Sequence, residues 1–255
     1  MKIDLENAKE EFIKYTQCYD FNDENIDLKQ KHSLRVMKNS KQIAKDMRLS
    51  EEEINLATLI GLLHDIARFE QYTQYKTFRD IDSIDHGDYG AEILKKDIRK
   101  YIETPQYDEI IIKAVKNHNK YKIEEGLSLK EELFAKIIRD ADKIDIMFET
   151  VDMFWKGKED IIENSTITEN VIQQFNEGSL IKRKKGEKLE NSINKIISTI
   201  AFIFDINFKA SFRIIKEENY INRILKRFDI KDEYTKKEVE KIRIKANDYI
   251  EEKSR

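Results

Sequence analysis

The sequence has few of the residue types that mark disulfide-rich or strand-rich proteins. Its 255 residues include one cysteine, one proline and seven glycines. A single cysteine, Cys18, can form neither an intramolecular disulfide nor a multi-thiolate metal site, which is typical of proteins in a reducing compartment. Because Pro105 and seven glycines are too few to supply the turns between many strands, the composition argues against a many-stranded β fold.

The chain also lacks a strong net charge and a long hydrophobic run. Its 47 lysines and arginines nearly balance 50 acidic residues, so the formal net charge is only -3 and no global charge attracts the chain to nucleic acid or a membrane. The most apolar blocks, Leu56–Leu63 and Ile196–Phe204, are too short to cross a bilayer. Charged residues follow Met1 directly, so we expect a cytoplasmic protein.

What the sequence does contain is helical periodicity. Apolar residues recur at steps of three and four, as in the stripes Ile110–Val115 and Phe134–Ala141, and no alternating pattern of comparable length is present. The sequence therefore predicts an all-α fold. Ser50 followed by Glu53 is a capping-box pattern, which predicts a helical hairpin near residue 49.

The second half of the chain continues the helical pattern. We expect helices within Asn170–Phe175, Leu189–Phe208 and Tyr220–Phe228, and a charged tail, Lys236–Arg255, that is solvent-exposed or docks a partner. The polar stretch Thr73–Asp88 is among the least structured, and long loops of this kind tend to be functional. Because no flexible linker or repeat interrupts the chain, we expect residues 1–255 to form a single domain.

All four histidines lie in the first half of the chain, at positions 32, 64, 86 and 118. His32 shares a helical face with Val36 and Ile43, and His118 extends the stripe that starts at Ile110. Both imidazoles are therefore expected to point into the core, where each needs a partner. Taken singly, such a histidine is more often a satisfied core residue than a metal ligand.

The most specific feature is the adjacent pair His64 and Asp65 near the end of a strongly apolar segment, Leu56–Ala67. A helix that is apolar nearly all round is buried. Because an unpaired buried carboxylate is costly, Asp65 needs a cation, and a metal is the best candidate if other histidines converge on it. Either Asp142 or Asp140 faces inward and could add a second carboxylate; periodicity does not choose between them.

Several motifs, in this order, resemble the HD superfamily of metal-dependent phosphohydrolases, an all-helical fold named for its adjacent His-Asp pair. The first ligand motif is matched by His32-Ser33-Leu34-Arg35-Val36, the namesake pair by His64-Asp65, and the closing aspartate motif by Ala141-Asp142-Lys143-Ile144. The resemblance selects Asp142 over Asp140. His86, in Asp85–Ala91, and His118, in Lys116–Asn119, resemble the additional histidines of members that hold two metals.

This resemblance implies both the fold and a metal centre. It implies a helical bundle with a metal-binding core at about residues 26–150. The resemblance fixes little beyond residue 150, where the apolar periodicity predicts a C-terminal helical extension at about residues 151–255. The ligands to two divalent ions would be His32, His64, Asp65, His86, His118 and Asp142, with Asp65 bridging the ions. Imidazoles and carboxylates suit iron, manganese or zinc, and two such ions can activate water for attack on phosphorus. If His86 were solvated, one metal would remain.

Two arginines each lie one helical turn beyond a ligand motif. Arg35 follows His32 and Arg68 follows His64, so either guanidinium could bind a substrate phosphate or form a structural ion pair instead. Some hydrolases of the family carry a glutamate where this chain has Arg68, so the resemblance implies no extra carboxylate at that position.

The segment after the His-Asp pair also indicates what kind of substrate the protein could bind. The aromatic residues Phe69, Tyr72, Tyr75 and Phe78 follow at three-residue steps and could stack a nucleobase, although core packing is the more common use of such a stripe. The basic run at residues 182–185 is short and fits a solvated loop. We expect a small phosphorylated substrate, preferably a nucleotide, and neither nucleic acid nor a membrane as partner.

These observations predict a metal-dependent phosphohydrolase, with Asp65 central to catalysis, that cleaves a phosphoester or phosphoanhydride of a nucleotide or related small molecule. Two alternatives stay open. Diiron oxygenases of this fold, such as myo-inositol oxygenase, use the same ordered ligand set, and a non-catalytic sensor could bind a nucleotide in the same pocket. The flanking arginines favour hydrolysis, and the complete ligand set argues against a sensor.

Overall fold

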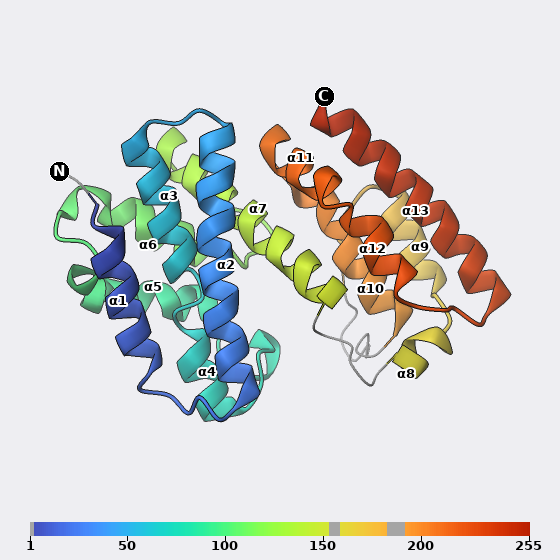
Figure 1. Cartoon of the computed structure of the whole chain (residues 1–255), viewed down its shortest axis with the longest axis horizontal. Helices are drawn as coiled ribbons and strands as arrows, with labels where there is room; N and C mark the ends of the chain where they lie inside the picture. The colour runs from blue at the N-terminus through green and yellow to red at the C-terminus, as the bar shows by residue number, and fades with distance from the viewer. Residues whose placement is uncertain (1–2, 153–158, 183–191) are drawn as a thin grey trace. The chain divides into compact units, whose positions relative to one another are not determined.

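The computed structural model describes residues 3–152, 159–182 and 192–255. Within these ranges every regular element is an α-helix or a short 3-10 helix, so the prediction of an all-α fold is confirmed (Figure 1). No helix of these ranges is long and apolar enough to cross a membrane. The chain divides into two compact units, Met1–Asp142 and Lys143–Arg255, and the single-domain organisation stays a prediction.

The first unit carries all the residues that the sequence singled out as ligands. Its elements are α1 (Leu5–Thr16), α2 (Glu24–Asp46), α3 (Glu51–Leu63), α4 (Arg68–Tyr75), η1 (Asp80–Asp82), α5 (His86–Asp97), η2 (Ile98–Lys100), η3 (Pro105–Tyr107), α6 (Asp108–Asn117) and the first part of α7 (Leu129–Asp152). Their buried faces form one apolar core that includes Phe12, Leu59, Phe69 and Phe134.

Helices α2 and α3 form the predicted hairpin and lie side by side (Figure 1). The capping box is present: the Ser50 side chain accepts a hydrogen bond from the Glu53 amide, and the Glu53 carboxylate accepts one from the Ser50 amide. Gly61 allows the two helices to approach closely, because a Cβ there would lie 2.6 Å from Ser40 Oγ and 2.9 Å from Val36 O. This approach brings the end of α3 close to the middle of α2.

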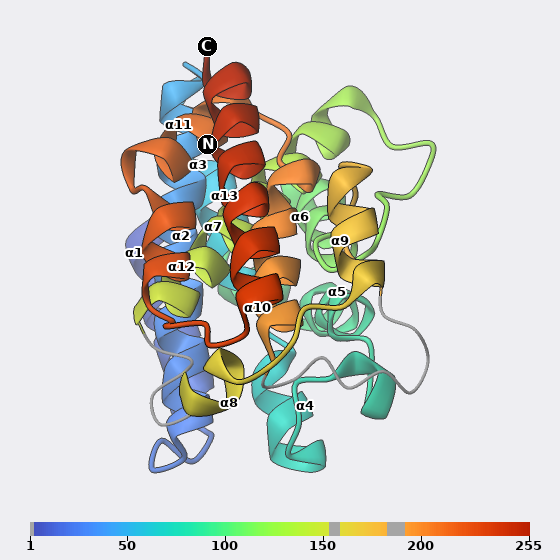
Figure 2. The same cartoon turned by 90° about the vertical axis from the view of Figure 1, so that its right-hand side faces the viewer.

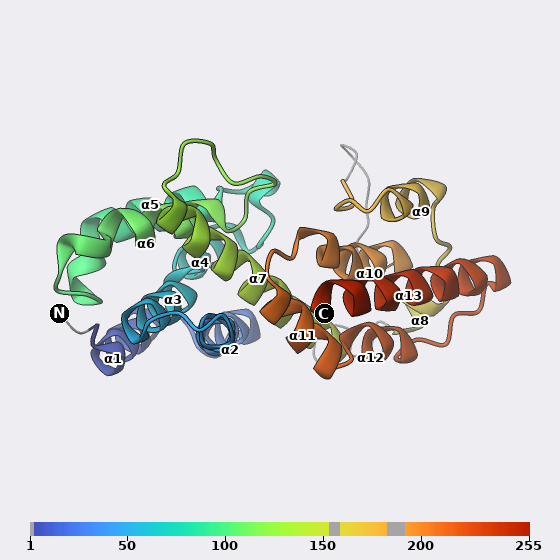
Figure 3. The same ribbon diagram turned by 90° about the horizontal axis from the view of Figure 1, so that it is seen from above.

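Helices α5 and α6 form a second pair (Figure 3). At Gly90 an added Cβ would lie 3.1 Å from Val115 Cγ1, so the glycine again permits close packing. Ala91 and Leu94 of α5 and Ile111 and Ala114 of α6 are buried. The pair presents the first residue of α5 and the residue after α6 to the same part of the core.

The second unit is formed by α8 (Glu159–Glu163), α9 (Glu169–Asn176), α10 (Ile193–Ile200), η4 (Ala201–Asp205), α11 (Lys209–Glu217), α12 (Tyr220–Lys226) and α13 (Glu233–Ser254). The charged tail is not wholly solvent-exposed, and docking of a partner on its other face stays a prediction. Val239, Ile242, Ala246 and Ile250 give α13 a buried face, and it packs against α11 and α12 (Figure 2). Most of the basic run at residues 182–185 lies outside the described residues.

Candidate metal centre

The structure brings the six candidate ligands together inside the first unit, although they come from five different segments. They are His32 of α2, His64 and Asp65 after α3, His86 at the start of α5, His118 after α6 and Asp142 of α7. Five of them are buried, and the Asp142 side chain is 16% exposed. Asp140, the alternative that periodicity left open, is also buried, but Asp142 is the aspartate that contacts the histidines.

Asp65 lies between two pairs of histidines. Its Oδ2 atom is 3.5 Å from His32 Nε2 and 3.7 Å from His64 Nε2. Its Oδ1 atom is 3.5 Å from His86 Nε2 and 3.4 Å from His118 Nε2. One carboxylate therefore faces a different pair of imidazoles with each of its oxygens, as a ligand that bridges two ions must.

Asp142 completes the first of these two groups. Its Oδ1 atom lies 3.1 Å from His32 Nε2 and 3.7 Å from His64 Nε2, and the two Nε2 atoms are 3.2 Å apart. We call His32, His64, Asp65 and Asp142 the first ligand group. Asp65, His86 and His118 form the second ligand group, which has one carboxylate fewer.

Two of the histidines follow the last residue of a helix. The sequence placed His64 and Asp65 within the apolar helix, but α3 ends at Leu63 and His64 is its C-cap, as His118 is for α6. His64 Nδ1 lies 2.9 Å from Gly61 O, and His118 Nδ1 lies 2.6 Å from Val115 O. These carbonyls belong to the last turns, whose oxygens lack helical partners. Because a carbonyl can only accept, both Nδ1 atoms donate, and the Nε2 atom of each ring is the one that faces the centre.

His86 is oriented by a carboxylate instead. Its Nδ1 atom lies 2.6 Å from Asp80 Oδ2, and burial of Asp80 is outweighed by His86 and Arg68, which hold the pKa of this carboxyl below its ordinary value. The ionised carboxylate accepts the Nδ1 proton, so His86 Nε2 is a bare acceptor. Asn119 Nδ2 donates to the same Asp80 oxygen at 3.0 Å. Gly87 makes room for Asn119, since a Cβ there would lie 2.3 Å from its Oδ1.

The second ligand group fits a metal ion on the grounds of hydrogen-bond chemistry. His86 Nε2 and His118 Nε2 are 3.0 Å apart, and each ring already uses its Nδ1 atom for another partner, Asp80 or the Val115 carbonyl. Two imidazole nitrogens that face each other beside a carboxylate are a donor set suited to a cation. Burial, together with the nearby Arg68 charge, lowers the pKa of His86 to about 3, and burial lowers the pKa of His64. Neutral imidazoles with fixed Nδ1 donors are the form in which histidine binds metals.

Two basic residues compensate the buried Asp65 charge. Lys29, one turn before His32 in α2, places Nζ 2.9 Å from Asp65 Oδ2, and Arg68 Nε is 3.4 Å from Oδ1. Burial raises the pKa of Asp65, but Lys29, His64 and Arg68 together overcome this effect and hold it well below the ordinary value. The carboxylate is therefore ionised, as a ligand must be.

The two arginines that the sequence proposed for substrate binding have different surroundings. Arg68 reaches the centre, and its Nη1 atom donates to Gln71 Oε1 at 2.8 Å, Phe78 O at 2.6 Å and Asp80 Oδ1 at 3.2 Å. Its Nε atom is buried without a hydrogen bond among the residues that the structure describes. Arg35 lies in α2, one turn beyond His32, with a partly exposed side chain.

The aromatic stripe after the His-Asp pair serves two purposes. Phe69 is buried in edge contacts with Phe12 and Tyr15, so it belongs to the core. Tyr72 and Phe78 stack on each other with centroids 4.7 Å apart. Lys29 Nζ lies 5.2 Å and the Arg68 guanidinium carbon 5.7 Å from the Phe78 ring centroid, so this ring adjoins both cations beside Asp65.

Sequence reasoning missed three residues of the centre. Lys29 had a usable signal, because a cation one turn before a predicted inward-facing histidine shares its helical face. Asn119 directly follows His118, but only the folded chain shows that its amide reaches Asp80. Asp80 lies in a polar loop without periodicity, so no sequence pattern pointed to it.

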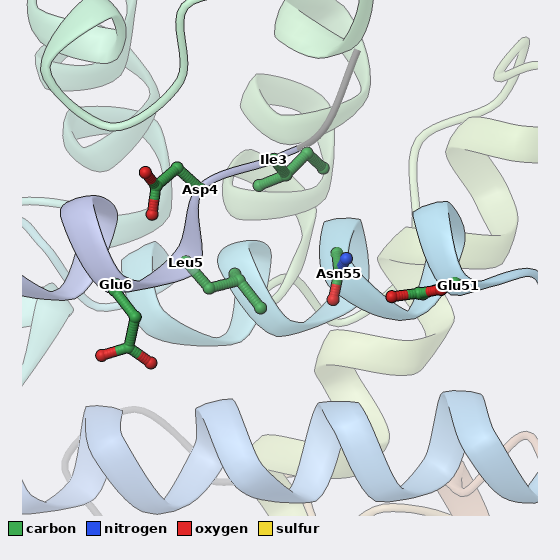
Figure 4. Close-up of a pocket in the computed structure, with 6 residues that line it drawn as sticks. All are labelled: Ile3, Asp4, Leu5, Glu6, Glu51 and Asn55. Atoms are coloured by element: carbon green, nitrogen blue, oxygen red, sulfur yellow. The ribbon is translucent and has the colours of Figure 1, made fainter.

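The first unit also has a surface hollow away from these residues. It has a volume of about 450 Å³ and lies where α1 and α3 begin, as Figure 4 shows. Its lining residues are Ile3, Asp4, Leu5, Glu6, Glu51 and Asn55. None of the six candidate ligands lines it, so the hollow is separate from the metal centre.

Comparison with known protein families agrees with this geometry. The family described as the HD domain matches residues 30–147, a range that includes all six candidate ligands. Comparisons with curated proteins and with solved structures gave no match. Residues 30–147 therefore match the HD domain, a family whose members are generally metal-dependent phosphohydrolases.

Proposed function

We propose that this protein is a two-metal phosphohydrolase that cleaves a phosphoester or phosphoanhydride of a nucleotide or related small molecule. The observation that carries the proposal is the position of Asp65, whose two oxygens each face a separate pair of histidine Nε2 atoms. A binding module has little need for a carboxylate shared between two groups of metal-ligating side chains. The match of residues 30–147 to the HD domain supports the same reaction class.

The first ligand group would hold one ion through His32, His64, Asp65 and Asp142, and the second ligand group would hold another through Asp65, His86 and His118. Imidazole and carboxylate donors suit iron, manganese or zinc. When bound, two such ions supply an activated water and stabilise charge on the phosphoryl oxygens. The hydrogen bonds at Nδ1 of His64, His86 and His118 keep their Nε2 atoms aimed at these positions.

The surrounding cations account for the choice of a phosphate substrate. Lys29 and Arg68 flank Asp65 on opposite oxygens, and Arg35 lies one turn beyond His32. A phosphate that reaches the centre meets this positive charge, which orients it and offsets its negative charge. Arginine fits this task through its planar set of donors.

The aromatic pair suggests what is attached to the phosphate. The Phe78 ring lies beside both Lys29 and Arg68 and is partly exposed, and it stacks on Tyr72. A flat base attached to a phosphate could continue this stack while its phosphate contacts the cations. This arrangement supports a nucleotide over a simple sugar phosphate.

The proposal is tested by metal analysis and hydrolysis on the same samples. We expect about two metals per chain and phosphate release from a nucleotide or a generic phosphodiester in the presence of Mn²⁺. Asp65→Ala should lose metal binding and activity together, because it removes the ligand shared by both groups. Asp82→Ala, on an exposed part of the nearby η1 turn, is the matched control and should keep both.

Other outcomes would replace the proposal. Full activity in Asp65→Ala contradicts the assignment of this residue. Oxygen uptake with ferrous iron and no phosphate release would identify an oxygenase with the same ligands. Tight nucleotide binding without turnover under several metals would identify a sensor.

A further inference from the structure

Asp80 links several elements of the centre, although it is not itself a candidate ligand. Its carboxylate accepts from His86 Nδ1 at 2.6 Å, Asn119 Nδ2 at 3.0 Å, Gln71 Nε2 at 2.9 Å and Arg68 Nη1 at 3.2 Å. These partners come from α5, the turn after α6, and α4. A single carboxylate in the η1 turn thus joins the second ligand group to the cation beside Asp65.

The two ligand groups differ in how they are supported. His64 and His118 are fixed by carbonyls of their own helices, which the helices position on their own. His86 instead depends on Asp80, which lies six residues earlier in a loop that begins where Lys76 ends α4 in the left-handed region, with φ 52°. In the first ligand group, His64 is held by its own helix, and His32 and Asp142 lie within α2 and α7.

The loop is in turn fastened to α4. Gln71 is fully buried, and its Nε2 atom donates to Asp80 Oδ1 at 2.9 Å, Ser83 Oγ at 2.9 Å and Ile84 O at 3.0 Å. Asp80 itself is 29% exposed, and its neighbour Ile81 is 78% exposed. Gln71 therefore fastens the loop at three points, of which Asp80 is one, whereas the carboxylate that accepts from His86 belongs to Asp80.

We propose that Asp80 is a positioning residue that sets the occupancy of the second metal site by holding His86 in its ligating orientation. The inference rests on the two-metal centre proposed above. A carboxylate that accepts the Nδ1 proton fixes the tautomer and ring angle of a ligating imidazole and makes its Nε2 a better donor to the metal. Loss of Asp80 should weaken the second site and leave the first site filled.

The test measures metal content and not activity. Wild type and Asp80→Ala are loaded with Mn²⁺, and bound metal is counted by elemental analysis and by electron paramagnetic resonance. We expect two ions in an exchange-coupled pair in the wild type. In Asp80→Ala the second ion should bind about 10- to 100-fold more weakly, the usual effect of losing such a partner. At limiting Mn²⁺ its spectrum should be that of one isolated ion.

Three further variants separate positioning from general damage. Asp80→Asn keeps an acceptor oxygen but not the charge, and it should partly restore the second ion. Gln71→Ala loosens the loop without removing the acceptor for His86, so it should affect the second ion less than Asp80→Ala does. Asp82→Ala changes a neighbouring carboxylate that pairs with Arg79 and should behave as the wild type.

The outcomes distinguish the inference from the function on which it rests. Two tightly bound ions in both the wild type and Asp80→Ala overturn the role of Asp80 and leave the proposed function intact. Equal losses in Gln71→Ala and Asp80→Ala also overturn it, because loop order alone would then explain the effect. Fewer than two ions in the wild type contradict the two-metal centre itself, and the inference falls with it.

Discussion

At the scale of single residues, the main feature of the centre is the buried negative charge of Asp65. Asp65 is nearly inaccessible to water and yet ionised, because Lys29 and Arg68 contact its two oxygens. A buried carboxylate that loses a charged partner is strongly destabilising. The stability of the metal-free protein should therefore depend on these two side chains more than on other cations nearby.

Lys29→Met tests this dependence. Without metal, the substitution should lower the free energy of unfolding by about 2 to 4 kcal/mol, because it leaves the Asp65 charge less compensated. Added Mn²⁺ should restore most of this loss by neutralising the same carboxylate. Chemical denaturation with and without chelator measures both effects. Lys31→Met is the control, since Lys31 is 56% exposed and pairs only along its helix with Asp27.

The pH dependence of the metal-free protein follows from His86. The pKa of His86 in the folded chain, about 3, lies below the ordinary histidine pKa of about 6.5. At a pH between these two values, the unfolded chain therefore binds more protons than the folded chain does. Stability therefore rises with pH across this window and is lost as pH falls. Going from pH 7 to pH 5 should cost about 2 kcal/mol through this residue. Denaturation with chelator at both values measures the loss.

The His86→Gln variant supplies the comparison for that measurement. It cannot take up the proton, so its stability should fall less between pH 7 and pH 5 than that of the wild type. Asp80 also has a lowered pKa, but its contribution is lost only below the ordinary aspartate value of about 3.9 and so does not enter this window. Equal slopes for both proteins would contradict the pKa of His86.

At the scale of helices, the distance between α2 and α3 sets the first ligand group. Gly61→Ala would place a Cβ 2.9 Å from Met37 Cα and Val36 O, which are backbone atoms that cannot rotate away. We expect a loss of stability of about 1 to 3 kcal/mol and weaker binding of the first ion, because α2 carries His32. Thermal unfolding and Mn²⁺ titration test both effects.

Gly90→Ala provides the matched change at the other helix pair. There the nearest atom is Val115 Cγ1 at 3.1 Å, a side-chain methyl that can shift. The variant should therefore lose less stability than Gly61→Ala. Equal losses of stability in Gly61→Ala and Gly90→Ala would show that close contact with backbone atoms is not the reason why Gly61 is needed.

The helices show which parts of the molecule were readable from sequence. Periodicity and the Ser50 capping box predicted α2, α3 and α6 because each is amphipathic or buried over several turns. Periodicity did not show that α3 stops at Leu63, since the apolar residues continue through Ile66 and Ala67. The sparse apolar residues of α13 looked too few for a buried face, but their spacing is sufficient once α11 and α12 cover them.

The candidate ligands were predicted on different grounds. Their order and motifs, through the resemblance to the HD superfamily, selected all six, including Asp142 in place of Asp140, and the structure brings these side chains together. The hydrogen bonds that aim them were not readable, because the acceptor for His86 is Asp80 in a loop and those for His64 and His118 are backbone oxygens. Such partners depend on where helices end, which periodicity locates poorly.

At the scale of the whole molecule, all six candidate ligands belong to the first unit. Metal binding should therefore slow amide hydrogen exchange mainly in α2, at the ends of α3 and α6 and at the start of α5. Peptides from α9 to α13 should change little, since the described part of the second unit contributes none of the six ligands. Exchange measured by mass spectrometry with and without Mn²⁺ checks this, and equal protection of both units would contradict it.

The ends of α3 and α6 also give the centre an electrical polarity. His64 and His118 cap these two helices, and their rings lie 5.1 Å apart, so two carbonyl ends meet there. Aligned peptide dipoles give each such end a partial charge of about -0.5. This field attracts a cation, so the backbone of α3 and α6 adds to the negative charge that Asp65 and Asp142 place at the same histidines. The affinity of the centre for a metal ion therefore depends on where these two helices end as well as on the ligands.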